Sequence, residues 1–156
     1  MRKEPIRATD VEAIRGQSVY PPPFAQQVAG RTKHRLGDVF GLTSFGVNLT
    51  TLEPGAVSAL YHAHGVQDEF VFVLEGRATI IAGDAQYEAG PGDCIGFKGG
   101  TGLAHQLVNR TNAPLSYIEI GDRLPGDSVE YPHDDLAAKQ STGGSWIITR
   151  KDGTPY

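Results

Sequence analysis

Apolar and polar residues alternate in short runs through the middle of the chain. Phe45, Val47 and Leu49 fall on one side of a run while Asn48 and Thr50 fall on the other, which is typical of a half-buried strand. Similar runs recur between turns rich in glycine and proline, giving about eight predicted strands at residues 45–51, 57–64, 69–74, 77–82, 86–89, 94–97, 106–109 and 115–120. No helical pattern separates them, so the sequence predicts an all-β fold, an antiparallel sandwich or barrel.

The run at residues 69–74 is apolar on both of its faces. Val71 and Val73 share a face with Glu69, and the opposite face carries Phe70, Phe72 and Leu74. A barrel interior covers only one face, so the other must lie under another part of the chain or a second subunit. We favour a homodimer, with cover by the N-terminal segment as the alternative.

The chain divides into three regions on this pattern. Residues 1–37 form an N-terminal arm expected to pack on the outside of the barrel, residues 38–121 form the barrel, and residues 122–156 form a C-terminal tail with one or two short elements. At 156 residues the chain has the size of one domain.

Composition narrows the location and the partners. The single cysteine, Cys94, excludes an intrachain disulfide, and Glu4 and Pro5 interrupt the apolar stretch that a signal peptide needs. The net charge is −4 and the chain has no basic run, which argues against binding to nucleic acid. No segment of the sequence is long and apolar enough to span a membrane. We therefore expect a cytoplasmic protein that binds neither nucleic acid nor membrane.

Histidine spacing indicates a metal site. His62 and His64 are two residues apart, which on a strand places both imidazoles on one face. Glu69 follows at an odd spacing, so residues 65–68 must bend for it to face them, and His105 comes from a later strand. Three imidazoles and a carboxylate suit a divalent transition metal (Fe, Mn, Ni, Zn or Cu) and are too rich in nitrogen for calcium or magnesium. His34 and His133 lack such neighbours and are expected to be solvated loop residues.

Two segments resemble the motifs of the cupin superfamily. Residues 55–76 read Gly-x6-His-x-His-x4-Glu-x6-Gly, the first cupin motif with one extra residue before the first histidine. The second motif opens at Gly92-Asp93 and closes at residues 104–109, with two extra residues before His105 and a lysine at position 98 where the family often has proline. The tail is similar to those of single-domain bacterial cupins. The resemblance implies a jelly-roll barrel, or double-stranded β-helix, whose open end holds a metal ion through His62, His64, Glu69 and His105.

The extra residues before His105 leave two possibilities. If residues 101–103 form a bulged loop, His105 reaches the site, whereas a shift of the strand by one residue would point it outward. Asp68 is next to Glu69, but the family spacing selects Glu69 as the ligand. Strand alternation further predicts pocket-lining roles for Leu60, Phe97, Tyr117 and Glu119.

Two function classes fit these residues. The first is a metalloenzyme acting on a small polar or carboxylate-bearing molecule, by the dioxygenase, decarboxylase or sugar-phosphate isomerase chemistry that occurs among cupins. The second is a module that binds or senses a small ligand without turnover. An enzyme, unlike a binding module, needs a titratable group beside the metal ion that is not itself a ligand. Glu119 is the candidate for this acid-base group.

Overall fold

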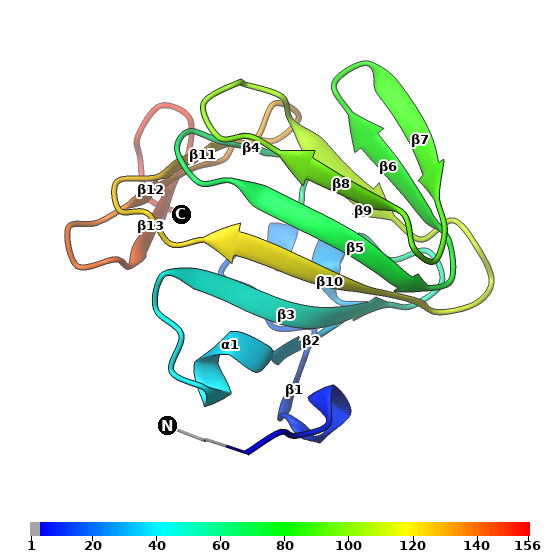
Figure 1. Cartoon of the computed structure of the whole chain (residues 1–156). Helices are drawn as coiled ribbons and strands as arrows, with labels where there is room; N and C mark the ends of the chain where they lie inside the picture. Colours follow the sequence, from blue (N-terminus) through cyan, green and yellow to red (C-terminus); the bar gives the residue numbers. More distant parts are fainter. Residues whose placement is uncertain (1–3) are drawn as a thin grey trace.

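The computed structural model describes residues 4–156 and consists mainly of strands (Figure 1). The helices are α1 (Leu36–Val39) and two short 3-10 helices, Ala8–Asp10 and Phe24–Val28. The strands are β1 (Ala13–Arg15), β2 (Arg31–Arg35), β3 (Phe45–Leu52), β4 (Ala63–His64), β5 (Glu69–Glu75), β6 (Ala78–Ala82), β7 (Ala85–Ala89), β8 (Cys94–Phe97), β9 (His105–Val108), β10 (Leu115–Asp122), β11 (Ser128–Glu130), β12 (Ala137–Gln140) and β13 (Trp146–Thr149). The prediction of an all-β fold is confirmed.

The strands form two facing layers in a jelly-roll arrangement. One layer is a six-stranded antiparallel sheet in the order β1-β2-β3-β10-β5-β8. The other contains a three-stranded sheet, β7-β6-β9, and a four-stranded sheet, β13-β12-β11-β4. The predicted strand at residues 57–64 is not continuous, because only Val57 and His62 pair with β9, as isolated bridges, before β4 begins.

Two clusters of buried side chains fill the space between the layers. The larger one lies under the six-stranded sheet and includes Leu52, Val73 and Leu115, each at most 1% exposed. The smaller one joins the tail to the barrel and contains Leu60, Val129, Tyr131, Leu136 and Ala138. The tail therefore completes the second core.

The arm is part of the sheet and does not merely lie on its outside. β2 pairs with β3 along its whole length, from Arg31 opposite Leu52 to Arg35 opposite Asn48, and β1 pairs with β2. As a result one face of β2 is turned toward the space between the layers.

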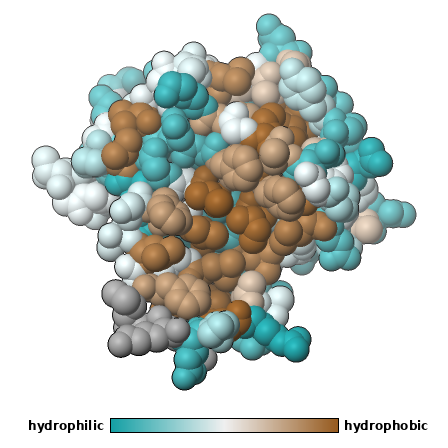
Figure 2. Space-filling view, viewed as in Figure 1, coloured by the Kyte–Doolittle hydropathy of each residue, from teal (hydrophilic) through white to brown (hydrophobic). Residues whose placement is uncertain are grey.

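The outer face of β5 is exposed. Phe70, Phe72 and Leu74 are 39%, 38% and 44% exposed, so in residues 4–156 neither the arm nor the tail covers them. Figure 2 shows apolar surface that is continuous over the region where β3, β10 and β5 lie in Figure 1. The alternative of cover by the arm does not hold for residues 4–156, and the homodimer stays a prediction. Among the helices of the described residues, none has the length and apolarity to cross a membrane.

Candidate metal site

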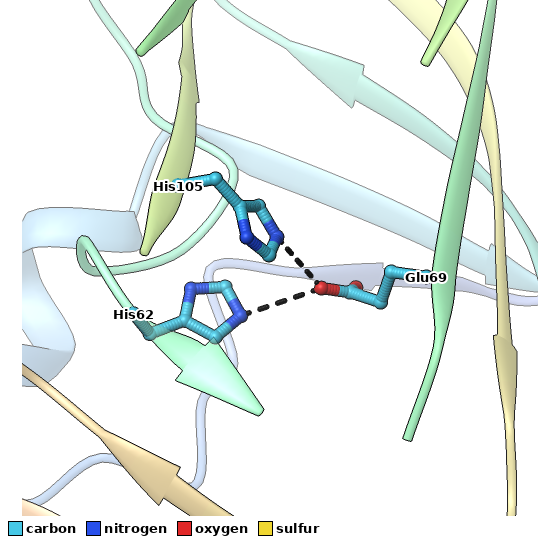
Figure 3. A group of neighbouring side chains, drawn as sticks. All are labelled: His62, Glu69 and His105. Atoms are coloured by element: carbon cyan, nitrogen blue, oxygen red, sulfur yellow. Dashed lines mark hydrogen bonds and ion pairs between the residues drawn. The ribbon is translucent and has the colours of Figure 1, made fainter. Parts of the chain in front are cut away.

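Two imidazoles from different parts of the chain converge on one carboxylate oxygen of Glu69. Glu69 Oε2 lies 2.9 Å from His105 Nε2 and 3.5 Å from His62 Nε2, and the three candidate ligand atoms are all within 4.8 Å of one another (Figure 3). His64 Nε2 lies 3.6 Å from the same oxygen, beside this group of three. The structure thus brings together all four side chains that the sequence analysis singles out.

Backbone pairing places His62 and His105 side by side. The His62 N–H donates to the His105 carbonyl at 3.1 Å, and the His105 N–H donates to the His62 carbonyl at 2.8 Å. Residues that exchange both hydrogen bonds in an antiparallel pair present their side chains on the same face. Because His64 is two residues further along, its imidazole is on that face as well.

A bend and a loop bring Glu69 and His105 into register. The chain bends at residues 65 and 66, and the Gly100 N–H donates to the His64 carbonyl at 3.0 Å, so the loop between β8 and β9 packs against this bend. A Cβ at Gly99 would lie only 2.3 Å from the Val66 carbonyl oxygen, which shows how closely the two backbones approach. The loop absorbs the extra residues, and His105 is buried and faces Glu69.

Each imidazole is held through its other ring nitrogen. Nδ1 of His62 is 2.8 Å from the Leu60 carbonyl oxygen, and Nδ1 of His105 is 3.5 Å from that of Leu103. Nδ1 of His64 is 2.6 Å from Asp127 Oδ2. Since carbonyl and carboxylate oxygens only accept, His62 and His64 donate from Nδ1, and the Nε2 atoms of all three rings face the Glu69 carboxylate. The 2.9 Å contact between His105 Nε2 and Glu69 Oε2 requires a proton or a cation between the two atoms.

Asp127 is the functional residue that the sequence analysis missed. It is 1% exposed, and its Oδ1 accepts hydrogen bonds from the N–H groups of Val66 at 2.8 Å and Gln67 at 3.3 Å. A carboxylate behind a histidine is a recurring arrangement at metal sites, where it fixes the tautomer and orients the ring. Asp127 lies 63 positions after His64, so no local spacing rule points to it.

The carboxylate of Glu69 is ionised in this setting. Burial would raise its pKa, but the hydrogen bonds with His105 and His62 and the charge on those rings outweigh burial and hold the pKa well below its usual range. With a metal ion in place of the protons between them, the same atoms would offer three nitrogen donors and one anionic oxygen, a donor set that fits a divalent transition metal.

The cluster opens into a cavity of about 460 Å³, within the range of small-molecule sites. Tyr117 and Glu119 line it as predicted from strand alternation, together with His62, His64, Glu69 and His105. Leu60 and Phe97 are not among the lining residues. Leu60 belongs to the smaller core cluster, and the Phe97 ring stacks behind that of His105 with the ring centroids 3.6 Å apart. Alternation does not hold for Leu60 because residues 58–61 are not in a regular strand.

The cavity also contains charged groups that the sequence analysis did not assign to a site. The Glu119 carboxylate forms an ion pair with Lys33 and accepts a hydrogen bond from Asn48 Nδ2 at 2.9 Å. Arg31 and Arg35 line the same cavity from β2.

The remaining histidines lie outside the cluster. His133 is exposed and stacks on Tyr61, with ring centroids 4.6 Å apart. His34, expected in a loop, is on β2 with its Nδ1 2.6 Å from the Val11 carbonyl oxygen.

Comparison with known proteins identifies relatives of the whole chain. A sugar phosphate isomerase of the cupin superfamily from Silicibacter pomeroyi is 42% identical, with a TM-score of 0.91 over 98% of this chain and 96% of that one. A candidate sugar phosphate isomerase from Acidithiobacillus ferrooxidans is 33% identical, with a TM-score of 0.74 over 81% of this chain and 80% of that one.

A more distant neighbour shares the fold alone. A polyketide cyclase from Streptomyces resistomycificus is 20% identical with a TM-score of 0.62, over 78% of this chain and 80% of that one.

None of the curated proteins matches the chain. Residues 48–121 match the family described as Cupin domain, and they include Glu69 and the three histidines that face it. Together with a relative that is 42% identical over nearly its full length, this match shows that the chain belongs to the cupin superfamily.

Proposed function

We propose that this protein is a metal-dependent enzyme that interconverts the aldose and ketose forms of a small sugar phosphate. His62, His64, Glu69 and His105 would hold the ion. The observation that carries the proposal is that Glu119, a carboxylate outside the cluster, lines the same cavity. A module that only binds a ligand needs no such acid-base group, whereas an isomerase does.

The substrate class is supported by the relatives and by the cavity. The Silicibacter pomeroyi protein that is 42% identical is named a sugar phosphate isomerase. A volume of about 460 Å³ suits a small molecule, and the lining mixes apolar side chains with charged ones. This combination favours isomerisation over dioxygenase or decarboxylase chemistry for this chain.

Aldose–ketose isomerisation needs two proton movements. A proton leaves the carbon next to the carbonyl and returns to the former carbonyl carbon, while a hydroxyl proton moves to the former carbonyl oxygen. A divalent ion, when bound, supplies Lewis acidity toward those oxygens. Glu119 would take the carbon-bound proton and return it, and Lys33 and Asn48 hold its carboxylate in place.

Tyr117 provides a neutral hydroxyl beside this carboxylate. Burial, and after it the charge of Glu119, raise the pKa of the Tyr117 hydroxyl well above its usual range. The hydroxyl therefore stays protonated and adds no negative charge beside Glu119.

Proton exchange with solvent tests the proposal. The protein is loaded in turn with Fe(II), Mn(II), Ni(II), Zn(II) and Cu(II), incubated in D2O with a panel of aldose phosphates, and followed by proton NMR. We expect loss of the C2 proton signal and formation of the ketose phosphate with at least one ion. Glu119→Gln should slow this by about 10²- to 10⁴-fold while the protein keeps its metal.

The matched control is Glu75→Gln, because Glu75 is exposed at the end of β5 and does not line the cavity. This variant should exchange at the wild-type rate. Metal-loaded protein that neither exchanges nor isomerises any member of the panel would contradict the proposal and favour a binding module.

A further inference from the structure

Three cationic side chains alternate along β2. Arg31, Lys33 and Arg35 are two residues apart, so they share one face of the strand, and all three line the cavity that contains the metal-ligand cluster. β2 lies outside residues 48–121, the segment matched by the cupin domain. These residues are therefore a feature of this chain's arm.

The cations are only partly neutralised. Lys33 pairs with Glu119, and Arg31 donates to the carbonyls of Ser58 and Gln17, which carry no charge. Arg35 makes no side-chain hydrogen bond or ion pair with residues 4–156. This wall of the cavity thus keeps an excess of positive charge, which concentrates anions in a cleft.

Two buried hydroxyls lie next to these cations. Lys33 is opposite Thr50 across the β2–β3 pair, and Thr50 is opposite Tyr117 across the β3–β10 pair. Thr50 Oγ1 and the Tyr117 hydroxyl are buried, and they face each other.

We propose that β2 is the phosphate-binding wall of the cavity, where Arg35 and Lys33 bind the phosphate group of the substrate. The inference rests on the proposed function and adds the orientation of the substrate. Across the sheet, Lys33 and Arg35 on β2, Glu119 on β10 and Glu69 on β5 follow in that order. The phosphate lies at β2, the metal-facing oxygens lie at β5, and the carbons that exchange a proton lie at Glu119.

Charge favours a phosphate over a carboxylate at this wall. A phosphate monoester carries a charge of about −1.5 to −2 near neutral pH, and a carboxylate carries only −1. The two arginines and the lysine exceed Glu119 by two positive charges. The planar guanidinium of Arg35 is also suited to paired hydrogen bonds with phosphate oxygens.

Titration of the metal-free full-length protein with inorganic phosphate tests this assignment. The measurement is made at pH 8, where histidine is mostly neutral, by calorimetry or phosphorus NMR, with acetate as the carboxylate comparison. We expect wild type to bind phosphate more tightly than acetate. Arg35→Ala should weaken phosphate binding about tenfold to a hundredfold, the effect of losing a charge-assisted contact.

The matched control is Arg15→Ala. Arg15 is an exposed arginine on the neighbouring strand β1 and is not among the residues that line the cavity. Arg15→Ala changes the net charge by the same amount as Arg35→Ala. If it binds phosphate as tightly as wild type does, the loss in Arg35→Ala comes from a lost contact and not from the change in net charge. Equal binding by wild type and Arg35→Ala, absence of phosphate binding by wild type, or acetate binding as tight as that of phosphate would each overturn the assignment.

The two proposals can fail separately. Phosphate binding is measured without metal and without turnover, so it stands even if the loaded protein isomerises nothing. If the metal-loaded wild type isomerises a sugar phosphate but Arg35→Ala binds phosphate as tightly as wild type, the proposed function stands and β2 is not the phosphate-binding wall.

Discussion

Replacing Asp127 with asparagine tests whether this residue sets the tautomer of His64. The wild-type carboxylate accepts from His64 Nδ1 through Oδ2 and from the Val66 and Gln67 N–H groups through Oδ1. Asparagine has the same shape but only one accepting oxygen, so a donor must face either the imidazole or the backbone N–H groups. In the first case His64 moves its proton to Nε2 and can no longer bind a metal through that atom.

The magnitude follows from this change. Loss of a carboxylate that supports a metal-binding histidine lowers affinity about 10- to 100-fold, equivalent to about 1.4–2.8 kcal/mol. The buried unpaired donor should also lower the free energy of unfolding of the metal-free protein by about 1–3 kcal/mol. Zn(II) affinity is measured by competition with a chromophoric chelator, and the histidine tautomer is read from nitrogen chemical shifts in the metal-free state.

Asp68→Asn is the matched control for this substitution. Asp68 is also an aspartate that accepts from a loop N–H group, that of Gly99 at 2.8 Å, and it adjoins Glu69 in the sequence, but it is exposed and has no imidazole contact. It should bind Zn(II) like wild type. An unchanged affinity in Asp127→Asn, or an equal loss in both variants, would refute the reasoning.

Three further predictions follow from the fold and the site. Gly76→Ala should lower the free energy of unfolding in urea by about 1–3 kcal/mol, because Gly76 has a φ of +81° and an added Cβ would lie 2.5 Å from the Pro114 carbonyl oxygen; unchanged stability would contradict this turn geometry. Phe72→Glu should convert the expected homodimer to a monomer in sedimentation without changing the circular dichroism, since the side chain is already 38% exposed; a monomeric wild type would refute the dimer prediction. EDTA should lower the melting temperature of the metal-loaded wild type by about 5–10 °C, from the roughly 2.7 kcal/mol that an ion at a hundred times its Kd contributes, and His62→Ala should show no such response.

Much of the site could be predicted because its geometry is local or shared by the family. The two-residue spacing of His62 and His64 sets their common face wherever the backbone is extended. Glu69 needed a bend, and residues 65 and 66 supply it. The position of His105 depended on the conformation of the inserted loop, which the approach of Gly99 to Val66 fixes only in three dimensions.

The cationic face of β2 could not be found from hydrophobic patterning. In β2 the face turned toward the interior carries Arg31, Lys33 and Arg35, so the usual signal of apolar residues at every second position is absent. The strand is identified by its pairing with β3, a contact between segments that the sequence alone does not align. Polar residues at inward positions are expected where a strand faces a cavity and not a core.

The central claim is that the converging imidazoles and Glu69 hold a metal ion, and elemental analysis tests it most directly. Wild type, His62→Ala and His133→Ala are expressed without added metal and purified without chelators. We predict one divalent transition metal ion per chain in wild type and in His133→Ala, whose histidine is exposed and outside the cluster, and a large loss in His62→Ala. Equal metal content in wild type and His62→Ala would contradict the account.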